Sequence, residues 1–305
     1  MRLQNDHVRV RVPATSANLG PGFDTAGLAL GIYDEIELRA VAGNTRVSVY
    51  GEGAETVPTD DNNLIVRAMR RTLDYLDASQ VGVIMTAHNR IPHASGLGSS
   101  AAAVVAGILL ARGLAGEGAL TDDEVLELAT QMEGHPDNAA PAIFGGVTFS
   151  WTVEENRGAR TIVLEAPSNI QASVLIPHQA VSTQQARAAL PPQVPHRDAA
   201  HNVARTGLLA LIMAGKASPA YLMDATEDRL HQRQRAETMP HTYELVEYLR
   251  ERGLPAVVSG AGPTVLVLAR LPGELIRDAK AAGWRVEQPD ISPTGATWEA
   301  SRSTG

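Results

Sequence analysis

The chain has 305 residues, of which 44% are apolar, and a formal net charge of −8. This length allows one large domain or two moderate ones, and the acidic balance disfavours nucleic acid and anionic membranes as partners. The chain has no cysteine, which excludes disulfide bonds, thiolate catalysis and cysteine-based zinc sites. The N-terminal residues lack the apolar stretch of a signal peptide, and no segment approaches the roughly 18 apolar residues of a membrane span. We therefore expect a cytoplasmic protein.

The first half of the chain alternates strand and helix patterns. Apolar residues with a period of two predict strands, and longer apolar-periodic segments predict helices. The expected strands are His7–Val12, Ile32–Val41, Thr45–Tyr50, Val81–His88, Val147–Val153 and Arg160–Leu164. The expected helices are Asn63–Asp77, Ser99–Arg112, Thr121–Gln131 and Ala139–Phe144. Thr121 and Glu124 have the spacing of a capping box, and Glu154–Gly158 is expected to be a polar turn.

The second half begins after a short linker, Ala166–Asn169. The expected strands here are Ala172–Ile176, Pro255–Ser259, Thr264–Ala269 and Trp284–Glu287. One helix is expected to begin at Ser182, with Gln185 in the box position, and others to span Arg197–Ala214, Pro219–Asp228, Thr242–Arg252 and Pro272–Ala282. The end, Ser292–Gly305, is rich in Ser, Thr and Gly and is expected to be frayed. The whole pattern indicates an α+β chain with two lobes.

The segment Pro92–Ala103 reads P-H-A-S-G-L-G-S-S-A-A-A and joins an expected strand to an expected alanine-rich helix. Glycines let backbone N–H groups approach a phosphate, and a helix N-terminus adds unpaired donors and a partial positive charge. Ser99 and Ser100 add hydroxyls that can cap the helix, bind a phosphate oxygen or ligate Mg²⁺. The lysine of a P-loop and the third glycine of a dinucleotide fingerprint are missing. Taken alone, the segment fits a phosphate cradle and a plain turn with a helix cap equally well.

Three segments together resemble the motifs of the GHMP kinase superfamily. They are Val12–Asp24 (V-P-A-T-S-A-N-L-G-P-G-F-D), Pro92–Ala103 and Val258–Leu268 (V-S-G-A-G-P-T-V-L-V-L). The first segment has no basic residue, which is similar to the homoserine kinase branch rather than to the mevalonate and galactose branches. The resemblance implies a two-lobed α+β fold with its active site in the cleft between the lobes. It places an N-terminal ATP-binding α+β domain at 1–166 and a C-terminal ferredoxin-like α+β domain at 167–305.

The resemblance also implies ATP-dependent phosphorylation of the L-homoserine hydroxyl, with ATP and Mg²⁺ as cofactors and a homodimer as a possible assembly. Phosphoryl transfer needs a cradle for the polyphosphate, a metal that offsets charge, and a holder for the acceptor. Ser95 departs from the family, in which many members carry arginine, and Arg90 could compensate. Asn63 is placed beside the adenine. The implied nucleotide-binding residues are Asn63, Pro92, Ser95, Gly96, Leu97, Gly98, Ser99, Ser100, Gly260 and Gly262.

Ser100 and Glu133 are the implied metal ligands, because in the family a glutamate and the last serine of the loop flank Mg²⁺. Without the resemblance, Glu133 at the end of an expected helix indicates a solvated carboxylate. Some relatives carry a longer insert after this glutamate, so Glu127 on the same expected helix is the alternative.

The implied acceptor site offers carboxylates and amides to an ammonium group and arginines to a carboxylate. The chain has only two lysines, both outside the motifs, so arginine must supply most of the positive charge. Relatives usually have H-Q-P-Y-R where His231–Arg235 reads H-Q-R-Q-R, which leaves open which arginine acts. The implied substrate-binding residues are Asn18, Asp24, His135, Asp137, Arg187 and Arg235, and the implied catalytic residues are Asp137 and Asn138.

The segment His135–Asn138 (H-P-D-N) has a second interpretation, because Asp and Asn ahead of an apolar helix are also common helix caps. No general base is obvious, and Asp137 is the nearest candidate. The family is thought to work by positioning and charge neutralisation, which a loose transition state permits.

Three functions remain open at this point. The first is homoserine kinase, and the second is a GHMP kinase with a different alcohol acceptor, which the altered segment His231–Arg235 allows. The third is a non-catalytic sensor that binds a nucleotide or another ligand. The segments A-N-L-G-P-G-F-D, H-P-D-N and S-T-Q-Q-A-R favour the first function, and the retention of Glu133 and the loop serines disfavours the third.

Overall fold

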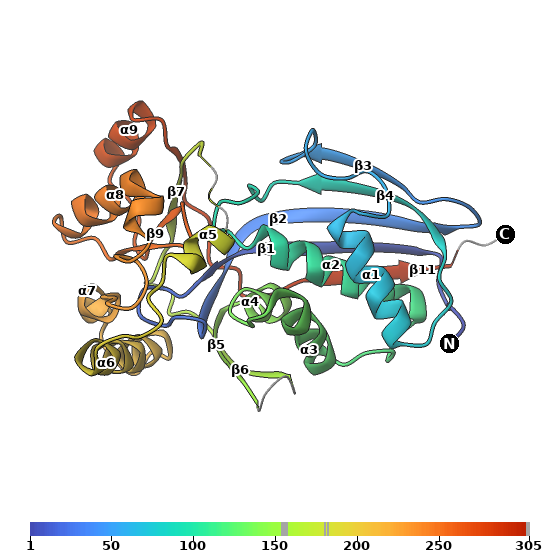
Figure 1. The fold of residues 1–305 in the computed structure, drawn as a ribbon, viewed down its shortest axis with the longest axis horizontal. Coiled ribbons are helices and arrows are strands. Elements are labelled where there is room, and N and C mark those ends of the chain that lie inside the picture. Colours follow the sequence, from blue (N-terminus) through green and yellow to red (C-terminus); the bar gives the residue numbers. More distant parts are fainter. Residues whose placement is uncertain (154–157, 180, 182, 303–305) are drawn as a thin grey trace.

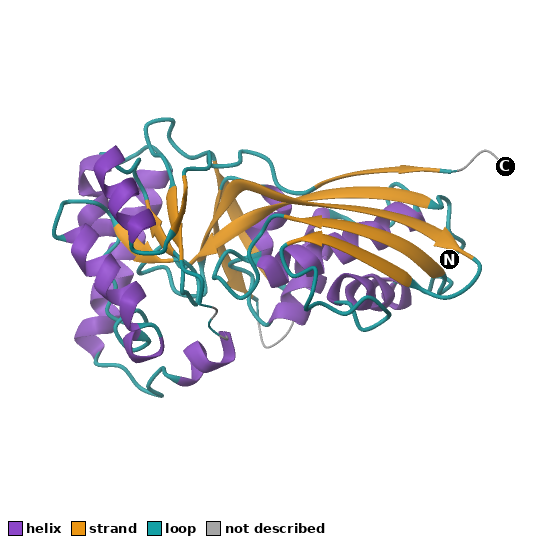
Figure 2. Ribbon diagram, turned by 90° about the horizontal axis from the view of Figure 1, so that it is seen from above, coloured by secondary structure: helices purple, strands orange, loops and turns teal. Residues whose placement is uncertain are grey.

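The computed structural model describes residues 1–153, 158–179, 181 and 183–302. Two β-sheets occupy opposite ends of an elongated molecule, as Figures 1 and 2 show. The expected polar turn at Glu154–Gly158 and the expected helix start at Ser182 fall mainly or wholly outside the described residues. Among the described residues, no helix combines the length and the apolarity needed to cross a membrane. The α+β prediction with two lobes is confirmed.

The first sheet has seven strands within the described residues. Its main path runs β11-β1-β2-β4-β3, β5 pairs with β2, and β6 pairs with β5. All neighbouring strands are antiparallel except β3 and β4, which are parallel. The strands are β1 (His7–Ala17), β2 (Ala26–Val41), β3 (Arg46–Gly51), β4 (Gly82–Asn89), β5 (Val147–Thr152), β6 (Ala159–Leu164) and β11 (Thr297–Ser301).

Alternation along the strands explains why one face of this sheet is covered by helices, as Figure 2 shows. Val8 and Val10 of β1 are buried against the helices, whereas Arg9 lies on the open face and pairs with Glu37 of β2. The helix α2 runs through the core with few exposed residues, because its alanines and glycines let neighbours approach closely. The helices of this lobe are α1 (Leu64–Tyr75), α2 (Ser99–Ala115), α3 (Asp122–Glu133) and α4 (Ala139–Phe144).

The second sheet has the strand order β10-β7-β9-β8, with antiparallel neighbours. Along the chain its elements follow the order β7, α8, β8, β9, α9, β10, which is the ferredoxin-like arrangement. The implied ferredoxin-like topology is therefore present. The strands are β7 (Ser173–Ile176), β8 (Ala256–Val258), β9 (Val265–Val267) and β10 (Arg285–Glu287). The helices are α5 (Thr183–Ala188), α6 (His196–Met213), α7 (Leu222–Ala225), α8 (Pro240–Arg250) and α9 (Gly273–Ala281), with 3₁₀ turns η1 (Pro219–Tyr221) and η2 (Ala236–Thr238).

Local sequence rules account for several element boundaries. Thr121 and Glu124 form the predicted capping box, with bonds in both directions, and α3 begins directly after Thr121. The helix ends at Gly134, whose φ of 88° only glycine adopts readily. The apolar helix Ala139–Phe144 forms with the predicted boundaries.

Four element predictions were wrong in extent. The strand β1 continues beyond Val12 to Ala17, and the strand expected to begin at Ile32 begins at Ala26, because the first motif pairs with the early part of β2. The helix expected over Pro219–Asp228 is a 3₁₀ turn followed by a short α7 that ends at Ala225. The end of the chain is ordered through Thr297–Ser301, because β11 pairs with β1 and Trp298 packs on the main core.

Candidate active site

A cavity of about 270 Å³ lies where the three motif segments meet, between the two sheets. It receives side chains from the start of α2, the end of α3, the turn before α4, the helix α5 and the turn before η2. The structure thus brings together residues that are far apart in the sequence, such as Asn18 and Gly260, which are separated by 242 positions. The predicted site residues that line this cavity are Asn18, Asp24, Ser95, Gly96, Gly98, Ser99, Ser100, Glu133, His135, Asp137, Asn138, Arg187, Arg235 and Gly260.

In the loop before α2, two glycines let the backbone approach the first and third motif segments closely. Gly96 and Gly98 have φ values of 86° and 70°, which disfavour other residues. A Cβ atom on Gly98 would lie 1.9 Å from Thr15 Oγ1, and one on Gly96 would lie 2.3 Å from the Ser259 carbonyl oxygen. Both glycines are therefore required by conformation and by the close approach of the first and third motif segments.

The first turn of α2 faces this cavity. In the described structure no side chain caps the helix, whose N-cap residue is Gly98. The first N–H groups of this 17-residue helix therefore remain available to donate to another partner. The helix dipole favours an anion at this position. Ser95 turns its hydroxyl inward, donating to the Pro92 carbonyl at 2.7 Å. The plain-cap interpretation of this segment does not fit these contacts.

Glu133 and Ser100 meet at the edge of the cradle. The Ser100 hydroxyl donates to Glu133 Oε1 at 2.8 Å. Burial raises the pKa of Glu133, and the bond from Ser100 and the nearby His135 oppose that rise. Glu127, the alternative, instead accepts from Gln131 and does not line the cavity. The structure therefore brings Glu133, and not Glu127, to the loop serine.

The turn His135–Asn138 directs three side chains into the cavity. Asp137 is 2% exposed and shares a short hydrogen bond with His135 Nδ1. Burial lowers the pKa of His135, but the hydrogen bond and the charge of Asp137 outweigh it, so the net shift is upward. Asn138 is the N-cap residue of α4, yet its side chain accepts from Thr15 Oγ1 at 2.8 Å instead of capping the helix. Asp137 is thus bonded to His135, and Asn138 is bonded to Thr15 instead of capping α4.

Asp24 and Arg187 form a two-pronged ion pair at the mouth of the cavity. Arg187 donates to the two carboxylate oxygens of Asp24 at 2.7 and 3.2 Å. Asn18 fixes the Asp24 backbone by accepting from its N–H at 3.0 Å, and donates to the Gly260 carbonyl at 2.9 Å. One acidic and one basic group are therefore presented side by side by different lobes of the protein.

Arg235 is buried and held from several sides. Its guanidinium donates to the carbonyls of Ala186 at 3.1 Å and Gly260 at 3.3 Å. His231 Nε2 lies 2.7 Å from the Gly20 carbonyl and must donate to it, which leaves Nδ1 to accept from Arg235 at 3.2 Å. Burial lowers the pKa of His231, in keeping with a neutral ring. His231 therefore positions Arg235.

The departure from the family pattern in this turn falls on outward positions. Arg233 is exposed, and Gln234 donates to the Arg229 carbonyl away from the cavity. His231 and Gln232 are buried, and Gln232 accepts from the Val258 N–H at 2.6 Å. The replaced residues therefore leave the buried contacts of the turn intact.

Four predicted nucleotide-binding residues do not line this cavity. Asn63 caps α1 by accepting from the Ile65 N–H at 3.0 Å. Leu97 is buried in the main core, and Gly262 packs against Met239. Pro92 lines a neighbouring cavity of about 570 Å³, which shares Ser95 with the first. Arg90, offered as a compensating charge, lines neither cavity.

Sequence reasoning missed the residues that support the site. Thr15 lies inside the first motif segment, and its hydroxyl donates to Asn138 Oδ1 at 2.8 Å. The Phe23 ring lies 5.7 Å from the Arg187 guanidinium and 5.4 Å from that of Arg235. Asp228 accepts from the backbone N–H groups of His231 and Gln232. An aspartate three residues before His231 is a pattern that predicts a turn whose backbone N–H groups bond to the aspartate side chain.

A glycine-built anion cradle that faces paired carboxylates and arginines, between an α+β lobe and a ferredoxin-like lobe, defines a small-molecule kinase of the GHMP class. Residues 63–146 match the model of the GHMP kinases N terminal domain, and residues 213–283 match that of the GHMP kinases C terminal domain. Homoserine kinase from Streptomyces avermitilis is 47% identical to this chain over 293 residues, which cover 95% of each protein. The chain belongs to the homoserine kinase family.

Two further comparisons agree. Homoserine kinase from Clavibacter michiganensis subsp. michiganensis is 51% identical over 285 residues, covering 92% of this chain and 89% of that protein. The crystal structure of homoserine kinase from Cytophaga hutchinsonii superposes with a TM-score of 0.83 at 25% identity, covering 97% of this chain and 98% of that one. The likeness therefore extends over both lobes.

Proposed function

We propose that this chain transfers the γ-phosphoryl group of ATP to the side-chain hydroxyl of L-homoserine, a step of threonine biosynthesis. The products are O-phospho-L-homoserine and ADP. One observation carries the proposal beside family membership: a single cavity joins the backbone cradle of Gly96–Ser100 to Asp24, Arg187 and Arg235. A site for an anion and a site for a small zwitterion therefore lie in the same cavity.

The cradle accounts for the nucleotide. Backbone N–H groups from Gly96 to Ala101 and the dipole of α2 attract phosphate oxygens, and no lysine is needed for this. Ser95 acts through its backbone and its fold-stabilising hydroxyl, so its replacement of a family arginine removes a charge without disturbing the loop. The neighbouring cavity beside Pro92 has room for the base and ribose. Asn63 supports that region by fixing the start of α1.

Glu133 and Ser100 would hold Mg²⁺. Their oxygens are 2.8 Å apart, both are hard ligands, and burial makes an uncompensated charge on Glu133 unfavourable. When bound, Mg²⁺ supplies positive charge that offsets the β- and γ-phosphates during transfer. The serine at the head of α2 and the glutamate at the end of α3 are held by two packed helices, so their spacing is fixed by the core.

The acceptor site matches both charges of an amino acid. Asp24 and Arg187 bond to each other in the structure, and an amino acid bound between them replaces this ion pair with two. The ammonium group goes to Asp24 and Asp137, and the carboxylate goes to Arg187 and Arg235. The Phe23 ring lies within cation–π distance of both guanidinium groups, at 5.7 and 5.4 Å. This arrangement leaves the substrate hydroxyl directed toward the cradle.

The chemical step is then mainly one of positioning. The hydroxyl oxygen of the acceptor bonds to the γ-phosphorus as the bond between that phosphorus and the bridging oxygen of ADP breaks. Asp137, beside His135, is the nearest acceptor for the released proton, and Asn138 orients the acceptor from a side chain already fixed by Thr15. Asp137→Asn separates the two roles of Asp137. A loss of only a few-fold in kcat excludes a base, and a loss of about 10²-fold or more supports one, since general bases contribute about 10²–10⁴-fold.

The proposal is tested by measuring ADP release with ATP and Mg²⁺ against L-homoserine, L-threonine, L-serine, mevalonate and galactose. Strong turnover of L-homoserine, with weak or no turnover of the rest, is expected. Turnover of a different alcohol would keep the kinase chemistry and overturn the acceptor assignment. Nucleotide binding without turnover of any acceptor would favour a sensor and contradict the proposal.

A further inference from the structure

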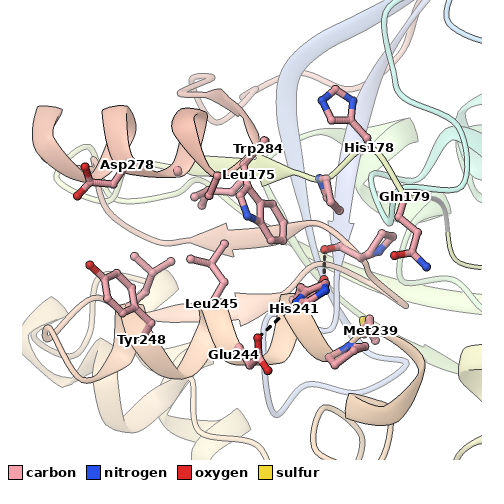
Figure 3. A pocket seen from close by; sticks show the side chains of 18 of the residues that line it. Leu175, His178, Gln179, Met239, His241, Glu244, Leu245, Tyr248, Asp278 and Trp284 are labelled. Carbon is pink, nitrogen blue, oxygen red and sulfur yellow. Dashed lines mark hydrogen bonds and ion pairs between the residues drawn. The ribbon is translucent and has the colours of Figure 1, made fainter.

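The groove that Figure 3 shows lies between α8 and α9, apart from the active-site cavity. It has a volume of about 730 Å³, and Leu175, Leu245 and Trp284 direct apolar side chains into it. His241 and Glu244, both exposed, pair with each other at its edge. Among the described residues, the groove and the active-site cavity have no lining residue in common. The contacts that hold the acceptor site together lie instead on α6.

Asn202 is the polar member of the buried face of α6, which otherwise consists of Leu209, Ile212 and Met213. Its side chain is almost fully enclosed, with 3% of the residue exposed. The helix lies beside α7 in the C-terminal lobe (Figure 1). A buried amide needs partners for its donors and for its oxygen, because an unpaired polar group in the interior is costly. The partners of Asn202 therefore identify the segments that this side chain holds.

Three hydrogen bonds join the Asn202 side chain to two separate segments. Nδ2 donates to the Pro21 carbonyl at 3.1 Å and to Asp228 Oδ1 at 2.8 Å, and Oδ1 accepts from the Arg229 N–H at 2.9 Å. The orientation of the amide is fixed, because the carbonyl can only accept and the backbone N–H can only donate. Asn202 therefore ties the first motif segment to the turn that begins at Asp228.

The first motif segment carries Asp24, which the proposed function assigns to the ammonium group of the acceptor. Asn18, Leu19 and Asp24 have φ values of 71°, 48° and 53°. Residues other than glycine keep such values only where surrounding contacts hold them. The bond from Asn202 to the Pro21 carbonyl is one of these contacts, and it comes from the other lobe. The position of Asp24 therefore depends on α6.

The turn that begins at Asp228 carries Arg235, which the proposed function assigns to the carboxylate of the acceptor. The Asp228 carboxylate is fully buried and accepts from the N–H groups of His231 at 3.0 Å and Gln232 at 2.8 Å. His231 Nδ1 in turn accepts from Arg235 at 3.2 Å. Asn202 stands at the start of this series of bonds, so the position of the guanidinium also depends on it.

From these contacts we propose that Asn202 is a positioning residue of the acceptor site, which sets the spacing between the Asp24 carboxylate and the Arg235 guanidinium. Its side chain does not line the active-site cavity, so it acts through the two segments and not by touching the acceptor. An acceptor with both an ammonium group and a carboxylate needs both partners at a fixed spacing, whereas an acceptor with one charge needs only one partner. Asn202 therefore contributes to the selection of an amino acid over a simpler alcohol. This inference rests on the proposed function, because it takes L-homoserine as the acceptor.

The test compares kcat/KM of Asn202→Leu and of the wild type for three acceptors. They are L-homoserine, 3-amino-1-propanol, which lacks the carboxylate, and 4-hydroxybutyrate, which lacks the ammonium group. Leucine keeps the branched shape of asparagine and forms none of its hydrogen bonds. For L-homoserine, kcat/KM should fall about tenfold or more, and for each shortened acceptor less than about threefold, because only L-homoserine depends on the spacing. The KM for ATP should stay within about twofold, since the cradle is built from other segments.

Asn89→Leu is the matched control. Asn89 is also buried, donates to the Glu52 carbonyl at 3.2 Å, and lines neither the active-site cavity nor the one beside Pro92. This variant should lose stability but keep the preference for L-homoserine. Thr206→Val removes a second bond to the Pro21 carbonyl, at 3.0 Å, and should reduce the preference less than Asn202→Leu does.

Three kinetic results would overturn the proposal: unchanged kinetics of Asn202→Leu, an equal fall of kcat/KM for all three acceptors, or the same reduced preference in Asn89→Leu. The last two would show that Asn202 acts only on stability. Thermal unfolding reports whether Asn202→Leu folds, and if it does not, Asn202→Ala carries the same prediction. If neither variant folds, Asn202 is a requirement of the fold and the proposal is wrong. Failure of the proposed function is a distinct result, because the wild type would then not phosphorylate L-homoserine.

Discussion

The two halves of the active-site cavity are built by different means. The nucleotide half is backbone: glycines at positive φ, the start of a buried helix, and contacts too close for any added side chain. The acceptor half is charge: Asp24 with Arg187, His135 with Asp137, and Arg235 held by His231. A backbone site binds a part common to all substrates, whereas a charged site can be changed one side chain at a time. This division predicts which substitutions abolish activity and which only change the acceptor affinity.

The largest effect is expected from Gly98→Ala. The new Cβ atom would lie 1.9 Å from Thr15 Oγ1, and its φ of 70° adds about 1–2 kcal/mol of strain. We expect a loss of activity of about 100-fold or more, because displaced cradle atoms misalign the phosphates. Gly118→Ala is the control, since Gly118 has a φ of 84° and nothing within 4 Å. If both variants show the same kinetics, the cradle is not limited by close contact.

The next effect is expected from Glu133→Gln, which removes the charged partner of Ser100. We expect kcat to fall by about 10²–10³-fold, because the phosphates lose charge compensation in the transition state. Titration with Mg²⁺ at saturating ATP measures the change. Glu127→Gln, on the same helix but outside the cavity, should change kcat by less than about twofold. A larger effect at Glu127 than at Glu133 would show that the alternative ligand is the correct one.

On the acceptor side, Arg187→Gln should act on KM rather than on kcat. Loss of a charge-assisted pair is expected to raise the KM for L-homoserine about 10- to 100-fold and to leave the KM for ATP within about twofold. Arg233→Gln removes the same charge from the exposed part of the neighbouring turn and should be silent. An equal rise in the KM for ATP after Arg187→Gln would mean that the two halves are not separate.

The smallest effect on activity is expected at Asp34, a buried residue that lines neither cavity and whose substitution should act on stability. Its carboxylate accepts from the backbone N–H groups of Arg90 and Ile91, and burial, opposed by these bonds, raises its pKa to about 6. A raised carboxyl pKa favours the folded state below pH 3.8, and this contribution is lost as the pH rises through 6. Relative to the wild type, Asp34→Asn should therefore gain up to about 3 kcal/mol of stability between pH 4 and pH 7. Urea unfolding at both pH values measures this, and an unchanged difference would contradict it.

The sequence predicted the elements far better than the contacts between them. Short periodic segments such as Ala139–Phe144 were located to the residue, because local pattern decides them. The strand β11 was missed, since five residues in a polar tail gain their order only by pairing with β1. The bonds from His231 to the Gly20 carbonyl and from Asn18 to the Gly260 carbonyl also join residues that are distant in the chain. Motif resemblance named the residues of the cavity, but their pairing could come only from the fold.

The most direct test of this division compares L-homoserine with two shortened acceptors. 3-Amino-1-propanol lacks the carboxylate, and 4-hydroxybutyrate lacks the ammonium group, while both keep the primary hydroxyl. We predict that each loses about 100-fold or more in kcat/KM, because each leaves one charged partner of the acceptor site unpaired. The KM for ATP should stay within about twofold. Efficient phosphorylation of either shortened acceptor would contradict a site that recognises both charges of an amino acid.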